Sequence, residues 1–310
     1  MTAPPRLLAA AKINLFLKIT GRRPDGLHDL SSLVCFADYG DYLECAPEFA
    51  PEYAPESNPA GEDRLALGGP LAAALEEAGG AGLITAALQA LREAGCAIPP
   101  LAVRLEKNLP TGGGLGGGSA DAAALLRFLP GFFDQPLPPE QLARLAAGLG
   151  ADVPACLAGG WLHITGSGTQ IRELAAPQRL PFAVLANAGI SVPTGPVFAA
   201  WSETAKQSRP LDEAMWLAAL QQGDWPFLLQ LGNDLTEPAK ELHPGIADLL
   251  EVLEETGRRA GGDFLGAAMS GSGSSCFALM ARQSAAEQMA ADLTGRGLWA
   301  VSCALQGSAS

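Results

Sequence analysis

Hydrophobic and polar residues alternate near the start of the chain. Apolar side chains occupy every second position from Ile13 to Ile19, and they alternate with Lys12, Asn14, Phe16 and Lys18. Period-two alternation of this kind is typical of a β-strand, and it predicts one over the first twenty residues. The sequence Pro-Asp-Gly at 24–26 then predicts a turn, after which residues 30–43 continue in an extended pattern.

A second alternating segment leads into an unusual loop. LAVRLEKNLP, residues 101–110, predicts a strand that ends at its proline. Six glycines follow among the seven positions 112–118. Residues 119–129 then predict a helix, with Ser119 as its N-cap.

Strand and helix patterns occur in both halves of the chain. Helical spacing predicts helices near residues 84–94, 140–150, 211–222, 246–256 and 284–294. Strands are expected over 161–168 and 181–194, and 269–280 is expected to be a loop followed by a strand. This mixture favours an α+β fold with two domains, 1–165 and 166–310, and a single domain is the alternative. The Ala-Pro-Glu repeats in 46–63 predict a solvated loop or an irregular hairpin tip, and a Pro-rich docking motif is the alternative.

Composition narrows the classes of partner. The 310 residues carry a net charge of −13, whereas a nucleic-acid groove needs a basic stripe, so we expect no nucleic-acid partner. No apolar run approaches the roughly 20 residues that cross a bilayer, so no membrane partner is expected either. The six cysteines form no CxxC pair and the three histidines no HExxH, which favours reduced core cysteines, a cytoplasmic location and no zinc site. The sequence leaves monomer and homodimer both open.

The glycine-rich segment permits several interpretations. A Walker A loop needs a lysine after its last glycine, and none follows here. A dinucleotide-binding GxGxxG can be traced through Gly112, Gly114 and Gly117, but in so dense a run that match carries little information. A flexible linker with no binding role is the alternative, although linkers rarely connect a strand directly to an apolar helix. Unpaired N–H groups at a helix start favour an anion-binding site.

Three segments resemble motifs of the GHMP kinases. PTGGGLGGGSADAA (110–123) resembles the phosphate loop of that family, AKINLFLKI near the N-terminus resembles its first motif, and SGSGSSCFAL (270–279) its third. The resemblance implies a two-lobed α+β GHMP kinase fold. Its N-terminal lobe would be like the second domain of ribosomal protein S5 and its C-terminal lobe ferredoxin-like. It also implies that the third motif packs against the phosphate loop.

The same resemblance implies an ATP-dependent kinase that phosphorylates an alcohol on a small molecule. Its co-substrate would be ATP, assisted by Mg²⁺ whose ligands the sequence does not identify. The residues expected to bind ATP are Pro110, Thr111, Gly112, Gly113, Gly114, Leu115, Gly116, Gly117, Gly118 and Ser119.

Two residues match the catalytic positions of the family. Asp152, in Gly-Ala-Asp-Val-Pro, matches the proposed proton acceptor, although spacing alone favours a helix-capping aspartate equally. Lys12 matches the lysine expected beside it, although a solvated strand lysine is the common alternative. A neighbouring cation would keep the carboxylate ionised and stabilise a developing alkoxide.

The substrate contacts implied by the resemblance are Asn14, His28, Thr194 and Phe198. His28 matches a histidine that hydrogen-bonds cytosine, and Phe198 an aromatic residue that stacks on the base, so a cytidine-bearing substrate is expected. Many relatives have tyrosine directly before that histidine, whereas this chain has Leu27. Another kinase of the same family and a non-catalytic nucleotide-binding protein are the competing interpretations. The segment around His28 disfavours another kinase of the family, because such a kinase would have no reason to resemble a cytosine-binding protein there. The presence of Lys12 and Asp152 disfavours a non-catalytic protein, which would not need a base beside its phosphate loop.

Overall fold

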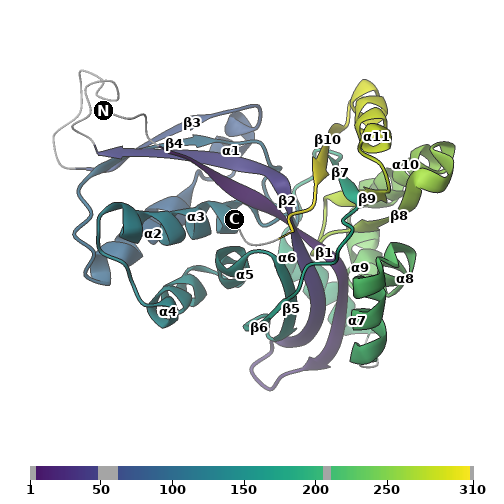
Figure 1. Cartoon of the computed structure of the whole chain (residues 1–310), viewed down its shortest axis with the longest axis horizontal. Coiled ribbons are helices and arrows are strands. Elements are labelled where there is room, and N and C mark those ends of the chain that lie inside the picture. The colour runs from purple at the N-terminus through teal and green to yellow at the C-terminus, as the bar shows by residue number, and fades with distance from the viewer. Residues whose placement is uncertain (1–4, 48–61, 205–210, 308–310) are drawn as a thin grey trace. The chain divides into compact units, whose positions relative to one another are not determined.

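The computed structural model describes residues 5–47, 62–204 and 211–307 (Figure 1). Residues 48–61, the greater part of the loop expected over 46–63, lie outside the described residues. The chain forms two compact units, each built from several segments. The first unit comprises 1–11, 39–111 and 116–157, and the second 12–38, 112–115 and 158–310. The single boundary at residues 165–166 stays a prediction.

Two long strands contribute residues to both units. β1 (Arg6–Arg22) and β2 (His28–Pro47) pair with each other, and each passes from one unit into the other. In the first unit, the later part of β2 pairs antiparallel with β4, which pairs parallel with β3. Gly40 allows the two long strands to approach closely, because a Cβ there would overlap the Ala9 carbonyl. The remaining elements of this unit are β3 (Arg64–Gly68), α1 (Ala72–Glu77), α2 (Gly82–Glu93), β4 (Leu101–Glu106), α3 (Gly117–Phe132), α4 (Pro139–Leu149) and α5 (Val153–Ala158).

The second unit contains the early part of β2 and a separate four-stranded sheet. The early part of β2 pairs antiparallel with β5 (Trp161–Gly166), which pairs antiparallel with β6 (Gln170–Leu174). The four-stranded sheet has the order β10-β7-β9-β8, and every neighbouring pair is antiparallel. Its strands are β7 (Phe182–Asn187), β8 (Phe264–Met269), β9 (Cys276–Met280) and β10 (Trp299–Ala304).

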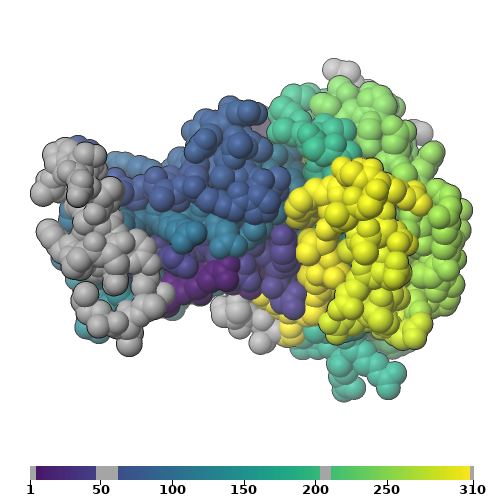
Figure 2. Space-filling model, turned by 90° about the horizontal axis from the view of Figure 1, so that it is seen from above, coloured from purple at the N-terminus to yellow at the C-terminus, as the bar shows by residue number. Residues whose placement is uncertain are grey.

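Helices cover this four-stranded sheet and give it a ferredoxin-like order. α10 (Gly245–Arg259) packs on β8 and β9, and α11 (Gln283–Gly295) packs on β7 and β10, so the sequence of strands and covering helices is βαββαβ. Figure 2 shows the yellow surface of α11 and β10 beside the yellow-green surface around α10. The other helices of this unit are α6 (Thr194–Thr204), α7 (Glu213–Gln222), α8 (Trp225–Gln230) and α9 (Thr236–Leu242).

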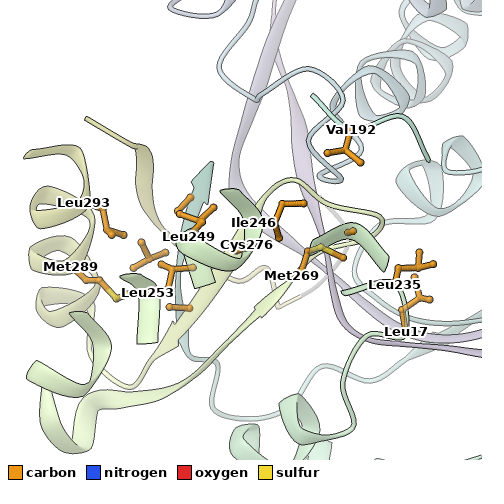
Figure 3. Packing of buried hydrophobic residues seen from close by; sticks show 14 of the residues in the cluster. Leu17, Val192, Leu235, Ile246, Leu249, Leu253, Met269, Cys276, Met289 and Leu293 are labelled. Atoms are coloured by element: carbon orange, nitrogen blue, oxygen red, sulfur yellow. The ribbon is translucent and has the colours of Figure 1, made fainter. Parts of the chain in front are cut away.

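An apolar core holds the sheet and its helices together. Leu249 and Leu253 of α10 and Met289 and Leu293 of α11 meet Cys276 of β9 in one buried cluster (Figure 3). Burying each such side chain contributes about 1.5–3 kcal/mol relative to leaving it exposed. The two helices predicted at 246–256 and 284–294 supply seven of the twenty buried residues of this cluster, and strands, other helices and connecting segments supply the rest.

The alternation in β1 does not produce one solvated face. Lys12 and Asn14 are 5% and 4% exposed, and Phe16 is fully buried against the edge of Trp216 in α7. Because side chains are buried on both faces of this part of the strand, the alternative of a solvated strand lysine at position 12 is wrong.

The strand expected over 181–194 is shorter than its hydrophobic pattern suggests. β7 ends at Asn187, whose side-chain oxygen accepts the N–H of Gly189, and Gly189 has a φ of 76°. This local turn interrupts the strand, and the chain resumes at Thr194 as α6. The expectation that the cysteines lie in the core is confirmed, since all six are buried.

The α10–β8 contact predicts a stability difference between two helical glycines. A Cβ at Gly257 would overlap the Phe264 ring, whereas a Cβ at Gly148 in α4 meets nothing within 4 Å. Gly257→Ala should lower the free energy of unfolding by about 1–3 kcal/mol through overpacking. Gly148→Ala should raise it by up to about 1 kcal/mol through helix propensity. Urea denaturation of both variants tests this, and equal shifts in the two would contradict the packing described.

Candidate active site

The glycine loop, residues 111–118, joins β4 to α3 through three left-handed glycines. Gly112, Gly114 and Gly116 have φ values of 66°, 75° and 69°. A residue with a Cβ adopts this conformation at a cost of roughly 1–2 kcal/mol, which explains glycine at these alternate positions. Gly116 is the N-cap of α3, and no side chain caps the helix. The prediction that Ser119 is the N-cap is therefore wrong, since Ser119 is the third residue of the helix.

The first turn of α3 presents main-chain N–H groups without side-chain caps. The first helical hydrogen bond runs from the N–H of Ala120 to the carbonyl of Gly116, at 2.8 Å. The N–H groups of Gly117, Gly118 and Ser119 precede it, so they have no intrahelical acceptor. These donors and the positive end of the helix dipole together form the kind of site that binds a phosphate.

Two charged side chains fill the space under this turn. A Cβ at Gly117 would lie 2.8 Å from Lys107 Nζ and 3.2 Å from Asp41 Oδ2. Lys107 donates to Asp41 Oδ2, and Asp121 Oδ2 lies 3.6 Å from Lys107 Nζ. All three side chains are buried. Glycine is thus required at position 117 by this ionic cluster, which the sequence analysis did not identify.

Burial and the neighbouring charges shift the pKa values of this cluster. Burial raises the pKa of Asp121 to about 7; the Lys107 ammonium opposes the shift and the Asp41 carboxylate adds to it. Burial lowers the pKa of Lys107, but the carboxylates of Asp121 and Asp41 more than offset that and raise it overall. Lys107 therefore stays charged, while Asp121 exchanges its proton near neutral pH.

A second loop packs against the glycine loop within the second unit. The N–H of Ser275 donates to the carbonyl of Gly113 at 2.9 Å. A Cβ at Gly114 would overlap the Ser270 carbonyl and lie 2.8 Å from that of Gly273. The expectation that the segment beginning at Ser270 packs against the glycine loop is confirmed.

The strand that carries Lys12 and Asn14 borders the same two loops. The N–H of Lys12 donates to the carbonyl of Leu115 at 2.8 Å, and the N–H of Asn14 to Ser270 Oγ at 3.2 Å. The Asn14 amide donates to Ser32 Oγ at 2.8 Å, whereas its Oδ1 is buried and has no hydrogen-bond partner among the described residues. Asn14 therefore offers a buried acceptor beside the glycine loop.

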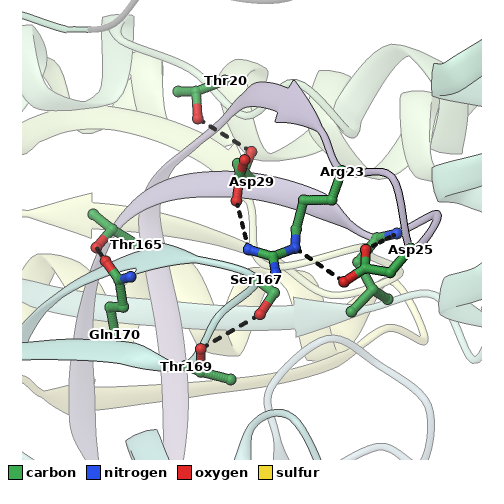
Figure 4. Close-up of polar contacts among 9 residues, drawn as sticks. Thr20, Arg23, Asp25, Asp29, Thr165, Ser167, Thr169 and Gln170 are labelled. Carbon is green, nitrogen blue, oxygen red and sulfur yellow. Dashed lines mark hydrogen bonds and ion pairs between the residues drawn. The ribbon is translucent and has the colours of Figure 1, made fainter.

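A tight turn positions His28 at the start of β2. The N–H of Arg23 donates to the carbonyl of Leu27, and Asp25 accepts the N–H of Leu27. Arg23 also donates to Asp25 at 3.2 Å and to Asp29 at 3.5 Å (Figure 4). These contacts fix the backbone on both sides of His28.

His28 and Phe198 come together in an aromatic cluster. Their rings are stacked with centroids 5.3 Å apart, Trp201 meets His28 edge-on, and His28 Nε2 lies 2.8 Å from Ser202 Oγ. Burial and the charge of Arg22 lower the pKa of His28, which favours the neutral ring. Trp201 and Ser202 were missed from sequence, although they lie three and four residues after Phe198, one helical turn along α6.

Two other residues singled out in the sequence are tied to local structure. Thr194 Oγ1 lies 3.0 Å from Ser272 Oγ, so Thr194 borders the loop that packs on the glycine loop. Asp152 directly precedes α5, and its carbonyl accepts the N–H of Cys156. Lys12 belongs to the second unit and Asp152 to the first, so their pairing stays a prediction.

The described residues offer neither a ready metal site nor a membrane-spanning helix. In those ranges no three His, Cys, Asp or Glu side chains are grouped so as to hold a metal ion. No helix there is both long and apolar enough to cross a membrane.

Comparison with known proteins gives the same family from both halves of the chain. The model of the GHMP kinases N terminal domain matches residues 82–160, and the GHMP kinases C terminal model matches 216–297. The 4-diphosphocytidyl-2-C-methyl-D-erythritol kinase of Rhizobium johnstonii is 41% identical over 288 residues, which cover 92% of this chain and 87% of that protein. The protein of that name from Cereibacter sphaeroides is 41% identical over 277 residues, covering 89% of each chain.

Solved structures agree with these relatives. A crystal structure of 4-(cytidine 5'-diphospho)-2C-methyl-D-erythritol kinase superimposes with a TM-score of 0.74 at 30% identity, covering 98% of this chain and all of that one. L. major mevalonate kinase, at 18% identity and a TM-score of 0.70 over the whole of both chains, shares the fold. The α+β architecture, the matched domains and these relatives lead to one conclusion: the chain belongs to the GHMP kinase family.

Proposed function

We propose that this kinase transfers the γ-phosphoryl group of ATP to the 2-hydroxyl of 4-diphosphocytidyl-2-C-methyl-D-erythritol. The products are the 2-phosphate and ADP, and the reaction belongs to the non-mevalonate route to isoprenoid precursors. The observation that carries the proposal is 41% identity, over 92% of the chain, to a kinase named for this substrate. We place the enzyme in the cytoplasm, in keeping with a sequence whose six cysteines form no CxxC pair.

The ATP triphosphate is assigned to Pro110–Ser119. Phosphoryl transfer depends mainly on positioning and on stabilising the charge of the phosphates. Main-chain N–H groups at the start of α3 supply positive potential without a side chain at Gly117 or Gly118. The left-handed glycines support this assignment, because they give the loop a backbone conformation that residues with a Cβ rarely adopt.

Asp152 and Lys12 are assigned to the acceptor hydroxyl. Asp152 takes the proton of the 2-hydroxyl, and the Lys12 ammonium stabilises the alkoxide that develops there. The burial of Lys12 supports this role, because a cation with little access to water acts more strongly on a neighbouring charge.

Asn14, His28, Thr194 and Phe198 are assigned to the substrate. The buried Oδ1 of Asn14 can accept a hydrogen bond from a substrate hydroxyl group. A neutral His28 ring can form a hydrogen bond with the edge of cytosine. Phe198 supplies an aromatic face for the base. Leu27 is 55% exposed, so this chain offers an aliphatic side chain where many relatives offer a second ring.

Mg²⁺ belongs to the proposal as a companion of ATP. The described residues do not fit a dedicated metal site, since no cluster of three carboxylate, imidazole or thiolate groups occurs among them. Mg²⁺ usually binds nucleotide phosphates while it keeps several waters. When bound in this way it would neutralise phosphate charge.

The substrate assignment predicts a sharp preference between two alcohols. Incubation with ATP, Mg²⁺ and the cytidylated substrate should yield ADP and the 2-phosphate. The uncytidylated 2-C-methyl-D-erythritol 4-phosphate should react poorly, because it lacks the base that His28 and Phe198 would hold. Coupled ADP release together with mass spectrometry of the product measures both reactions. Equal turnover of the two alcohols would contradict the role given to cytidine.

The assignment of Asp152 predicts a loss of turnover without a loss of binding. Asp152→Asn should lower kcat by about 10²–10⁴-fold, the usual contribution of a general base, and leave the Kd for ATP within a few-fold of its original value. Steady-state kinetics and calorimetry measure the two quantities. An unchanged kcat would contradict the assignment of Asp152 as a base. It would favour a helix-capping role, which fits the position of Asp152 directly before α5.

The packing of the glycine loop predicts that a glycine inside the loop and a glycine further along α3 respond differently to substitution by alanine. Gly114→Ala should weaken ATP binding at least tenfold, because the added Cβ would strain a left-handed residue and overlap the Ser270 carbonyl. Gly131→Ala is the matched control, since Gly131 lies on the same helix α3 outside the assigned ATP segment and its added Cβ would meet nothing within 4 Å. Calorimetric ATP titration of both variants tests this. Unchanged affinity in Gly114→Ala would show that the loop conformation does not matter for the nucleotide.

A further inference from the structure

Three buried charged groups lie under the N-terminal turn of α3 and have no part in the proposed chemistry. Lys107 follows β4, Asp41 lies on β2, and Asp121 lies on α3. Lys107 and Asp121 are each 2% exposed, and Asp41 is fully buried. One ammonium group thus faces two carboxyl groups in a place with little water, and such a set is not electrically balanced if both carboxyl groups are ionised.

Asp41 is the carboxylate that is fully satisfied. Its Oδ1 accepts the N–H groups of Asn108 and Leu109 at 2.6 and 2.8 Å, and its Oδ2 accepts from Lys107. Three donors thus satisfy both oxygens of this carboxylate. The Asp41–Lys107 pair therefore accounts for one negative and one positive charge, and it ties β2 to the segment that enters the glycine loop.

Asp121 is the carboxyl group that is not satisfied. Its Oδ2 lies 3.6 Å from Lys107 Nζ, beyond a good hydrogen bond, and its Oδ1 is buried without a hydrogen-bond partner among the described residues. An ionised Asp121 would add an uncompensated negative charge one turn below the N–H groups of Gly117 and Gly118. That charge would oppose the positive helix end that attracts a phosphate.

The surroundings of Asp121 leave Lys107 and Asp41 as the charges that act on it. Helix α2 packs on α3 and buries Ile84, Ala87, Leu88 and Leu91, and α4 packs on it and buries Ala146. These helices place no buried charged side chain against it. Burial moves the pKa of Asp121 to about 7, so a small change in local potential changes its protonation in the physiological range.

We propose that Asp121 is a positioning residue whose protonation is coupled to nucleotide binding. One proton from solvent adds to the Asp121 carboxylate as the triphosphate settles on the first turn of α3, which leaves the Lys107–Asp41–Asp121 cluster neutral beneath it. Because binding and protonation are linked, ATP binds more tightly at lower pH, and bound ATP makes Asp121 easier to protonate. The inference rests on the proposed function only in requiring that this turn of α3 holds ATP.

The coupling predicts a pH-dependent affinity that Asp121→Asn removes. From about pH 7.5 to 9, where ATP with Mg²⁺ is fully ionised, the Kd of the unmodified protein should rise, approaching about tenfold per pH unit. Asp121→Asn keeps the shape of the side chain and mimics its neutral form. Its Kd should stay nearly constant over the range and lie within about fivefold of that of the unmodified protein at the lower end. Asp248→Asn, a change at an exposed carboxylate on α10, is the matched control and should keep the original slope.

Calorimetry without acceptor alcohol, in two buffers of different ionisation enthalpy, measures both Kd and proton uptake. We expect the unmodified protein to take up a substantial fraction of one proton per ATP near pH 8, and Asp121→Asn to take up none. Proton uptake by the unmodified protein tests the coupling even if the variant folds poorly. A flat Kd with no uptake, or an Asp121→Asn variant that keeps the slope, would overturn the inference. Failure to bind ATP at any pH would instead contradict the proposed function.

Discussion

The site depends on a constraint of the main chain: N–H groups can surround a phosphate only where no side chain stands in the way. The glycine loop meets this constraint with alternating left-handed glycines and a helix whose first turn carries no capping side chain. A lysine-based phosphate site would tolerate more freedom in the backbone. In the proposed ATP site the recognition lies in the backbone itself, so the backbone conformation must be fixed by the residues that surround it.

Two sets of contacts hold the glycine loop in its conformation, one in each compact unit. In the second unit, Gly113 and Gly114 are held against the loop from Ser270 to Ser275, and Leu115 is hydrogen-bonded to Lys12. In the first unit, Gly117 rests on the Lys107–Asp41 pair. Breaking a buried ion pair by removing one partner commonly costs about 3–5 kcal/mol, so this support is rigid as well as charged. The same support brings an excess carboxyl group close to an anion site, and protonation of Asp121 resolves that conflict.

The sequence was most informative where a local pattern determines local structure. The strand before Pro110, the glycine loop and the amphipathic helices were predictable from periodicity and turn chemistry, and three short motifs identified the family.

The cap of α3 was mistaken because Ser119 is a common capping residue, whereas Gly116 takes that position through a left-handed φ that no periodicity reveals. The Lys107–Asp41–Asp121 cluster was missed for a different reason. Its members come from β2, from the segment that follows β4 and from α3, with Asp41 and Lys107 separated by 66 positions, and only tertiary structure brings them together. Trp201 and Ser202 could have been found from helical spacing after Phe198, had residues 194–204 been recognised as a helix.

The central claim is that main-chain N–H groups of residues 112–119 hold the triphosphate. Hydrogen–deuterium exchange resolved to single amides, with and without ATP and Mg²⁺, tests it most directly. The account predicts that saturating ATP slows exchange most strongly at Gly117, Gly118 and Ser119, whose amides have no acceptor within the helix. Tight ATP binding that leaves the exchange of these three amides unchanged would contradict it.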